Sequence, residues 1–134
     1  MPQSVTVSSI EKYQVLVRTP THSWIGDEPT RIGGDNLGPS PFEQLVAALG
    51  CCTVVTCHMY AARKKIPLEK VWADLNTHWE KNDGKETFHV DVLVRARGEL
   101  SDEDLERLKA VAAKCPVHKV LCPGCVIRFE VERV

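Results

Sequence analysis

The sequence Ser40-Pro41-Phe42-Glu43 marks the start of a long helix. Ser40 can cap the helix, Pro41 suits its first position, and Glu43 completes a capping box. Apolar side chains then recur at steps of three or four residues, which predicts one apolar helix face: Phe42, Leu45, Val46, Leu49, Cys52, Val55 and Met59. A helix that continues to Arg63 or Lys65 would be about 35 Å long at 1.5 Å per residue. Such a helix has to pass through the middle of a structure, and one small domain hardly covers it.

Shorter elements are expected on both sides of this helix. Three extended runs, at residues 4–8, 13–18 and 23–27, precede a segment at 28–39 that is rich in helix and strand breakers. Residues 71–80 and 86–97 should pair as a hairpin around Asn82-Asp83-Gly84. Ser101 caps a second helix, a short helix restarts after Cys115, and residues 126–133 alternate as a closing strand. The predicted fold is α+β, a single domain over residues 1–134 with the order β-β-β-α-β-β-α-α-β.

Charge and hydropathy exclude several classes of protein. A formal charge of −1 argues against nucleic-acid binding, which needs a basic face. The N-terminus lacks the pattern of a signal peptide, and the apolar stretch from Leu45 to Val55 is too short and interrupted to span a membrane. We therefore expect a cytoplasmic protein. In that reducing compartment its six cysteines are reactive, metal-binding or buried rather than a disulfide framework.

Two cysteines fall on the predicted inward faces of two different helices. For Cys52 the local pattern alone favours a buried, unreactive thiol. Cys115 has a different setting, because Pro116 disfavours helical geometry before it and suits the first position of a new helix. Backbone N–H groups at such a helix start stabilise a thiolate. Cys51 and Cys57 point away from Cys52 around the helix and are interpreted as packing residues.

A zinc site is the alternative use of the C-terminal cysteines. Cys115, His118, Cys122 and Cys125 form the spacing Cys-x2-His-x3-Cys-x2-Cys, which could supply four ligands. The three residues between the two half-sites make a tight loop, and the rest of the chain supplies a core without a metal. We expect no cofactor and no metal, and keep a zinc-binding or redox-sensing module as the second hypothesis.

Two motifs closely resemble the OsmC family, which includes the organic hydroperoxide resistance proteins. The first is Gly38-Pro-Ser-Pro-Phe-Glu-Gln-Leu-Val-Ala-Ala-Leu-Gly-Cys-Cys-Thr53, followed by Met59-Tyr60-Ala61. The second is Cys115-Pro-Val-His-Lys-Val-Leu121. The expected order of strands and helices is similar over essentially the whole chain. The resemblance implies an intertwined homodimer with central long helices, as the length of the predicted helix also suggests.

The same resemblance implies a redox activity. Cys52 would be the peroxidatic thiol and Cys115 the resolving thiol in the reduction of organic hydroperoxides or hydrogen peroxide, with an external dithiol as reductant. Thiol–disulfide exchange with protein partners is a further use of the same pair. A nucleophile in mid-helix needs a nearby cation, and the family uses an N-terminal arginine supported by a glutamate. Arg18 is the first candidate, with Arg31 the other, and Glu43 is the candidate glutamate although the capping box also explains it.

Overall fold

The structure is a computed structural model that describes residues 3–134. The chain divides into two compact units, one up to Ala47 and the other from Ala48 onward, and the boundary falls within the long helix α1, Pro41–Lys64. In the first unit, β1 (Thr6–Ser9), β2 (Val15–Arg18) and β3 (Ser23–Gly26) form an antiparallel sheet in sequence order. The three predicted extended runs are thus confirmed. A short 3-10 helix, η1 (Thr30–Ile32), lies within the breaker-rich segment.

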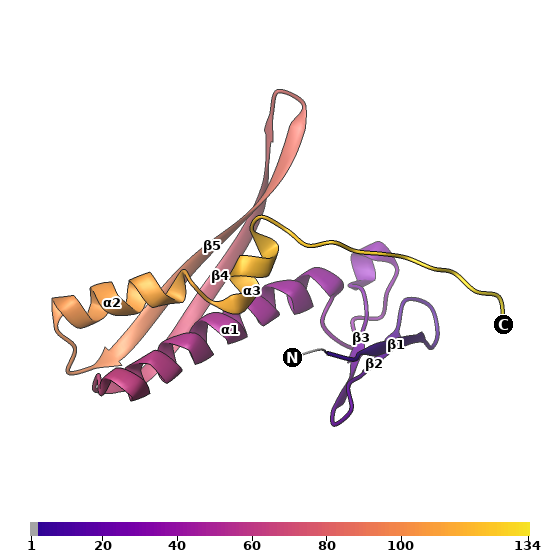
Figure 1. The fold of residues 1–134 in the computed structure, drawn as a ribbon. Helices are drawn as coiled ribbons and strands as arrows, with labels where there is room; N and C mark the ends of the chain where they lie inside the picture. Colours follow the sequence, from indigo (N-terminus) through magenta and orange to yellow (C-terminus); the bar gives the residue numbers. More distant parts are fainter. Residues whose placement is uncertain (1–2) are drawn as a thin grey trace. The chain divides into compact units, whose positions relative to one another are not determined.

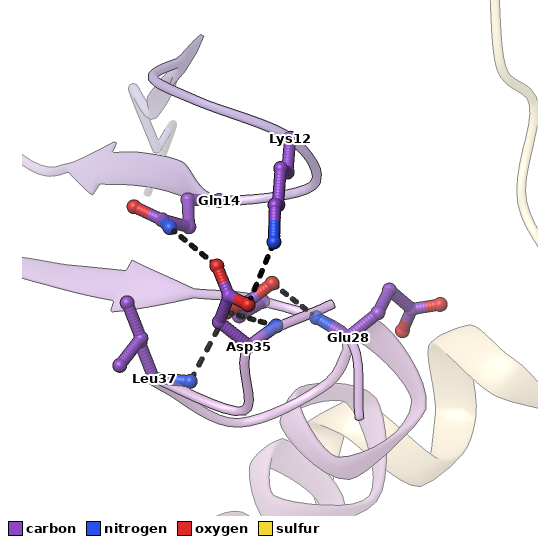
Figure 2. A network of polar contacts seen from close by, with 6 residues as sticks. Lys12, Gln14, Glu28, Asp35 and Leu37 are labelled. Atoms are coloured by element: carbon purple, nitrogen blue, oxygen red, sulfur yellow. Dashed lines mark hydrogen bonds and ion pairs between the residues drawn. The ribbon is translucent and has the colours of Figure 1, made fainter. Parts of the chain in front are cut away.

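A buried carboxylate organises the loop that follows β3. Asp27 is only 2% exposed and accepts hydrogen bonds from the backbone N–H groups of Glu28, Asp35 and Leu37. Nearby, Lys12 and Gln14 hold the carboxylate of Asp35, as Figure 2 shows. The bond from Leu37 lowers the pKa of Asp27 most, against the opposing effect of burial. The irregular segment is therefore ordered by one ionised side chain.

The second unit contains a long hairpin of β4 (Leu68–Asn82) and β5 (Lys85–Gly98) (Figure 1). The hairpin turns at Asp83 and Gly84, whose φ angles of 52° and 78° are those that a tight two-residue turn requires. Both strands are longer than the sequence predicts. Because side chains alternate across a strand, the register puts Val71 and Val94 on one face and His78 and His89 on the other.

The core of this unit lies between the apolar face of the hairpin and two helices, α1 and α2 (Asp102–Ala112). Its buried residues come from all of these elements and the loop after α1: Cys57, Ala61, Ile66, Val71 and Leu108. Gly50 lets α1 approach β4, since a Cβ atom there would lie 2.9 Å from Leu75 Cδ1. Ser101 and Asp104 form a capping box at the start of α2, as the sequence predicts at Ser101.

The face of α1 that is buried differs from the predicted one. The buried positions are Leu49, Gly50, Thr53, Cys57 and Ala61, whereas much of the predicted apolar stripe is exposed, including Met59 at 69% and Phe42 at 55%. Small residues occupy the buried face because the helix packs closely against the sheet. The helix is thus apolar on two sides, and one chain covers only one of them.

Helix α1 extends beyond both ends of the apolar stretch from Leu45 to Val55. Its 24 residues are long and apolar enough to cross a membrane by length and composition alone, with a mean hydropathy of 1.7 over an 18-residue window. The short length of the stretch between Leu45 and Val55 therefore does not apply to the whole helix. Central helices of soluble proteins have the same properties, so length and hydropathy do not decide between the two settings.

The closing strand predicted over residues 126–133 is not formed in the single chain. After α3 (Pro116–Leu121), residues 122–134 contain no helix or strand. Their apolar side chains are exposed, with Val126 at 79%, Phe129 at 87% and Val131 at 97%. A strand exists only when a neighbouring strand satisfies its backbone hydrogen bonds, and neither sheet of this chain pairs with the segment (Figure 1). The rest of the predicted order is confirmed.

Candidate functional site

Cys115 lies at a helix start, as Pro116 predicts. Its backbone is extended, with φ −65° and ψ 145°, and Pro116 begins α3. The Sγ atom of Cys115 accepts a hydrogen bond from the backbone N–H of His118 at 3.3 Å. The cysteine therefore caps α3 with its sulfur, which accepts from the one backbone N–H of His118.

The thiol of Cys115 is packed against α1. It is fully buried, and its Sγ atom lies 3.8 Å from the Oγ1 atom of Thr53. The Thr53 hydroxyl also lies 2.9 Å from the carbonyl oxygen of Leu49 and donates to it. Because a hydroxyl has one proton, the thiol of Cys115 is the donor to Thr53 Oγ1 when it is protonated. The two motif segments thus meet at Thr53, the residue directly after Cys52.

Cys57 is the second thiol beside Cys115. It lies one helical turn after Thr53 on the same face of α1, is fully buried, and has its Sγ atom 4.0 Å from the carbonyl oxygen of Leu108. Burial raises the pKa of the Cys57 thiol, and the neighbouring Cys115 raises it further. Cys57 is therefore held as a neutral thiol, which agrees with its prediction as a packing residue.

Cys52 is half-buried and lies on a different face of the helix. Successive helical residues are about 100° apart, so Cys52 is displaced by that angle from the face on which Cys115 rests. Its helical neighbours on the same side are Leu45, Val55 and Met59, which are exposed in the single chain. Cys115 therefore packs against α1 at the same helical turn as Cys52, but it contacts the neighbouring face of the helix, where Thr53 lies.

The other cysteines do not form a site in residues 3–134. All six cysteines of the chain are free, and Cys51, Cys122 and Cys125 are exposed. The exposure of Cys51 in the single chain contradicts its interpretation as a packing residue. In the described part of the chain, Cys115, His118, Cys122 and Cys125 are not gathered as a set of metal ligands. The zinc alternative gains no support from their arrangement.

Glu43 has the structural role that its position in the capping box predicts. Its Oε1 atom accepts from the Ser40 backbone N–H at 2.9 Å, and its own N–H donates to Ser40 Oγ at 3.2 Å. These bonds with Ser40 lower the pKa of Glu43 most, and the charge of Arg31 in η1 lowers it further. Arg18 lies at the end of β2, opposite Thr6 and Ser23. Of the two candidate arginines, Arg31 is the one whose charge lowers the pKa of Glu43.

A comparison of the sequence with models of known protein families shows to which family the chain belongs. The model of the OsmC-like protein family matches residues 33–130, which include both cysteine motifs. The chain belongs to the OsmC family. A search of curated proteins finds no match.

Solved structures share the OsmC fold at low sequence identity. An OsmC-like protein from Mycoplasma pneumoniae is 18% identical, with a TM-score of 0.77 over 91% of this chain and 88% of that one. An organic hydroperoxide resistance protein OsmC from Legionella pneumophila is 20% identical, with a TM-score of 0.67 over 88% of each chain. An organic hydroperoxide resistance protein from Elizabethkingia anophelis is 15% identical, with a TM-score of 0.65 over 90% and 89%. At these identities the likeness concerns the fold.

Two features of this OsmC-like chain were missed by reasoning from the sequence. Thr53 was overlooked because a polar residue interrupts the apolar pattern, although a buried threonine in a helix can bond the carbonyl four residues earlier. The pairing of His78 with His89 is the second feature that the sequence analysis did not predict. A two-residue turn at Asp83 and Gly84 already fixes their register as directly opposite, so the sequence did contain that signal.

Proposed function

We propose that this OsmC-like protein reduces hydroperoxides through Cys52 and Cys115. The observation that carries the proposal is the contact of Cys115 with Thr53, because it places a second thiol beside the turn of α1 that contains Cys52. Proteins with the same fold are named organic hydroperoxide resistance proteins. The substrate is a small, partly apolar hydroperoxide, in keeping with the apolar neighbours of Cys52 on its helix face.

The reaction has three steps. The thiolate of Cys52 attacks the distal peroxide oxygen, the O–O bond breaks, and a proton joins the leaving oxygen, which gives an alcohol or water and a sulfenic acid. The thiol of Cys115 then attacks the Cys52 sulfur and releases water as the disulfide forms. An external dithiol reduces this disulfide and restores both thiols. Because Cys115 rests on the adjacent face of α1, the second step requires a local movement of the start of α3.

The Cys52 thiolate needs a cation, because a position in mid-helix has no free backbone N–H group. An N-terminal arginine supplies this charge, as the family resemblance implies. Arg18 and Arg31 are the candidates, and the electrostatic link between Arg31 and Glu43 favours Arg31. In this scheme Glu43 holds the arginine and caps α1 at the same time.

The working form is a cytoplasmic homodimer in which residues 1–134 act as one domain. A second copy would cover the exposed apolar side of α1 and would provide a strand neighbour for residues 126–133. Burial of such side chains is worth about 25 cal/mol per Å² of apolar surface, which favours association. The family match supports a single domain because residues 33–130 extend across the boundary between the two compact units.

A peroxide-consumption assay coupled to a dithiol reductant tests this proposal. Cys52→Ser should abolish turnover of an organic hydroperoxide, while Cys115→Ser should complete one turnover and leave a sulfenic acid that a dimedone-type reagent traps. Cys51→Ser is the matched control, because Cys51 precedes Cys52 on the same helix and is exposed. Equal activity of Cys52→Ser and wild type would refute the proposal.

A further inference from the structure

Three potential metal ligands converge on the hairpin, away from the cysteines. His78 on β4 lies directly opposite His89 on β5, and their rings stack with centroids 4.8 Å apart. Glu80 lies two residues after His78 and therefore on the same face of the strand. One ligand atom from each of these three side chains lies within 4.8 Å of the others. Among the described residues no other such group of three occurs.

The individual contacts show which atoms converge. The Nε2 atom of His78 lies 3.2 Å from Glu80 Oε1, and the Nε2 atom of His89 lies 3.2 Å from Glu80 Oε2. In a tetrahedral site with bonds of about 2.0–2.2 Å, two ligand atoms are about 3.3 Å apart. The two nitrogen–carboxylate distances already have this value. The two nitrogens contact different oxygens of Glu80, so a movement of the side chains would bring the three groups onto one ion.

A fourth side chain orients one of the rings. The Nδ1 atom of His78 lies 3.4 Å from Asp91 Oδ2 on the neighbouring strand. If Nδ1 donates to Asp91, the proton of the neutral ring is on Nδ1 and the lone pair of Nε2 faces Glu80. A carboxylate that fixes the tautomer in this way is the usual outer partner of a metal-bound histidine. Asp91 would therefore position His78 without binding the metal.

We propose that His78, Glu80 and His89 bind a divalent transition metal ion such as Zn²⁺ on the outer face of the β4–β5 hairpin. Two imidazoles and a carboxylate suit Zn²⁺ and its neighbours in the first transition series, whereas Mg²⁺ and Ca²⁺ prefer oxygen ligands alone. The carboxylates of Glu80 and Asp91 supply negative charge that balances the charge of the divalent ion. With three protein ligands the ion keeps a position open to water or to another ligand. This site does not depend on the proposed peroxidase activity, because it shares no residue with it.

The test is titration of the full-length protein with Zn²⁺ and Co²⁺. The background is Cys122→Ser/Cys125→Ser, which removes two exposed thiols that could bind metal themselves. One equivalent of metal per chain should bind, and changes in backbone amide signals should concentrate around residues 78–91. The Co²⁺ form should lack the intense near-ultraviolet band of thiolate ligation.

Variants distinguish this site from adventitious binding. His78→Asn, His89→Asn and Glu80→Gln should each weaken Zn²⁺ binding by more than about tenfold, and Asp91→Asn by about tenfold, as expected for an outer partner. His22→Asn is the matched control, since His22 is also exposed but lies in the first unit, and it should leave binding unchanged. Absence of saturable binding to the double-serine protein would overturn the proposal, as would full binding by His78→Asn. A thiolate band in the Co²⁺ spectrum would assign the metal to cysteines instead and would equally overturn it.

Discussion

The Sγ atom of Cys115 lies 3.8 Å from the Oγ1 atom of Thr53, and both residues are buried. This contact joins the start of α3 to the middle of α1, two segments that are 62 residues apart in the chain. It gives the buried thiol a polar partner, and the backbone N–H of His118 donates to the same sulfur. Cys115 is thus fixed by two polar contacts beside the turn that contains Cys52.

Thr53→Val should destabilise the protein by about 1 kcal/mol, because it removes the hydroxyl that contacts Cys115 and bonds Leu49 while preserving shape and β-branching. Thr53→Ser keeps the hydroxyl and should retain these polar contacts. Urea denaturation of the reduced proteins measures both effects. If Thr53→Val were as stable as wild type, the contact would have no energetic role.

The raised pKa of Cys57 predicts a pH dependence of stability. A thiol whose pKa is raised on folding stabilises the fold while the unfolded thiol remains protonated, which is below its ordinary value of 9.0. This contribution is lost as the pH rises from there through the folded pKa. The free energy of unfolding should therefore fall between pH 8 and pH 10 by less in Cys57→Ala than in wild type.

The reference point for that experiment is the free energy of unfolding of Cys57→Ala and of wild type at pH 8, before the thiol titrates in either state. There Cys57→Ala should cost about 1–2 kcal/mol, because it removes one buried atom from the core. An identical decline with pH in both proteins would show that other groups account for it.

Gly98 and Gly84 form a matched pair of glycines with positive φ. Gly84, at φ 78°, has open space where a Cβ atom would stand, whereas at Gly98, with φ 149°, a Cβ would lie 2.2 Å from the carbonyl oxygen of Pro67. Gly84→Ala should cost about 1–2 kcal/mol from backbone strain alone. Gly98→Ala should cost more, since the end of β5 must also move. Thermal unfolding of the two variants measures the difference, and equal losses would contradict the close approach.

Local sequence signals predicted where the helices and the hairpin form, but they did not predict which side chains are buried. The capping sequences at Ser40 and Ser101 and the turn at Asp83 act over a few residues, so they located α1, α2 and the hairpin. The buried face of α1 depends instead on what packs against it, and small residues such as Thr53 gave no apolar signal there. For the same reason residues 126–133 showed a strand pattern, although a strand forms only where a partner is present. The Cys115 cap was predictable because Pro116 restricts its neighbour locally.

Arginine variants test which cation acts in the proposed reaction. Arg31→Ala should lower the rate of Cys52 oxidation by hydroperoxide by about 10- to 100-fold, because the reacting thiolate loses the cation that stabilises it. Arg18→Ala is the matched control on β2 and should have a smaller effect. Stopped-flow measurement of Cys52 oxidation by an organic hydroperoxide gives the rates of both variants. A larger loss in Arg18→Ala would reverse the assignment.

The central claim is that Cys52 and Cys115 form the redox pair, and disulfide mapping tests it most directly. The reduced protein is treated with one equivalent of an organic hydroperoxide, the remaining thiols are alkylated, and tandem mass spectrometry distinguishes Cys51, Cys52 and Cys57 within their shared helix. The account predicts a Cys52–Cys115 disulfide formed in parallel with peroxide loss, and neither event in Cys52→Ser. A Cys57–Cys115 or Cys122–Cys125 disulfide formed while Cys52 stays reduced would contradict it.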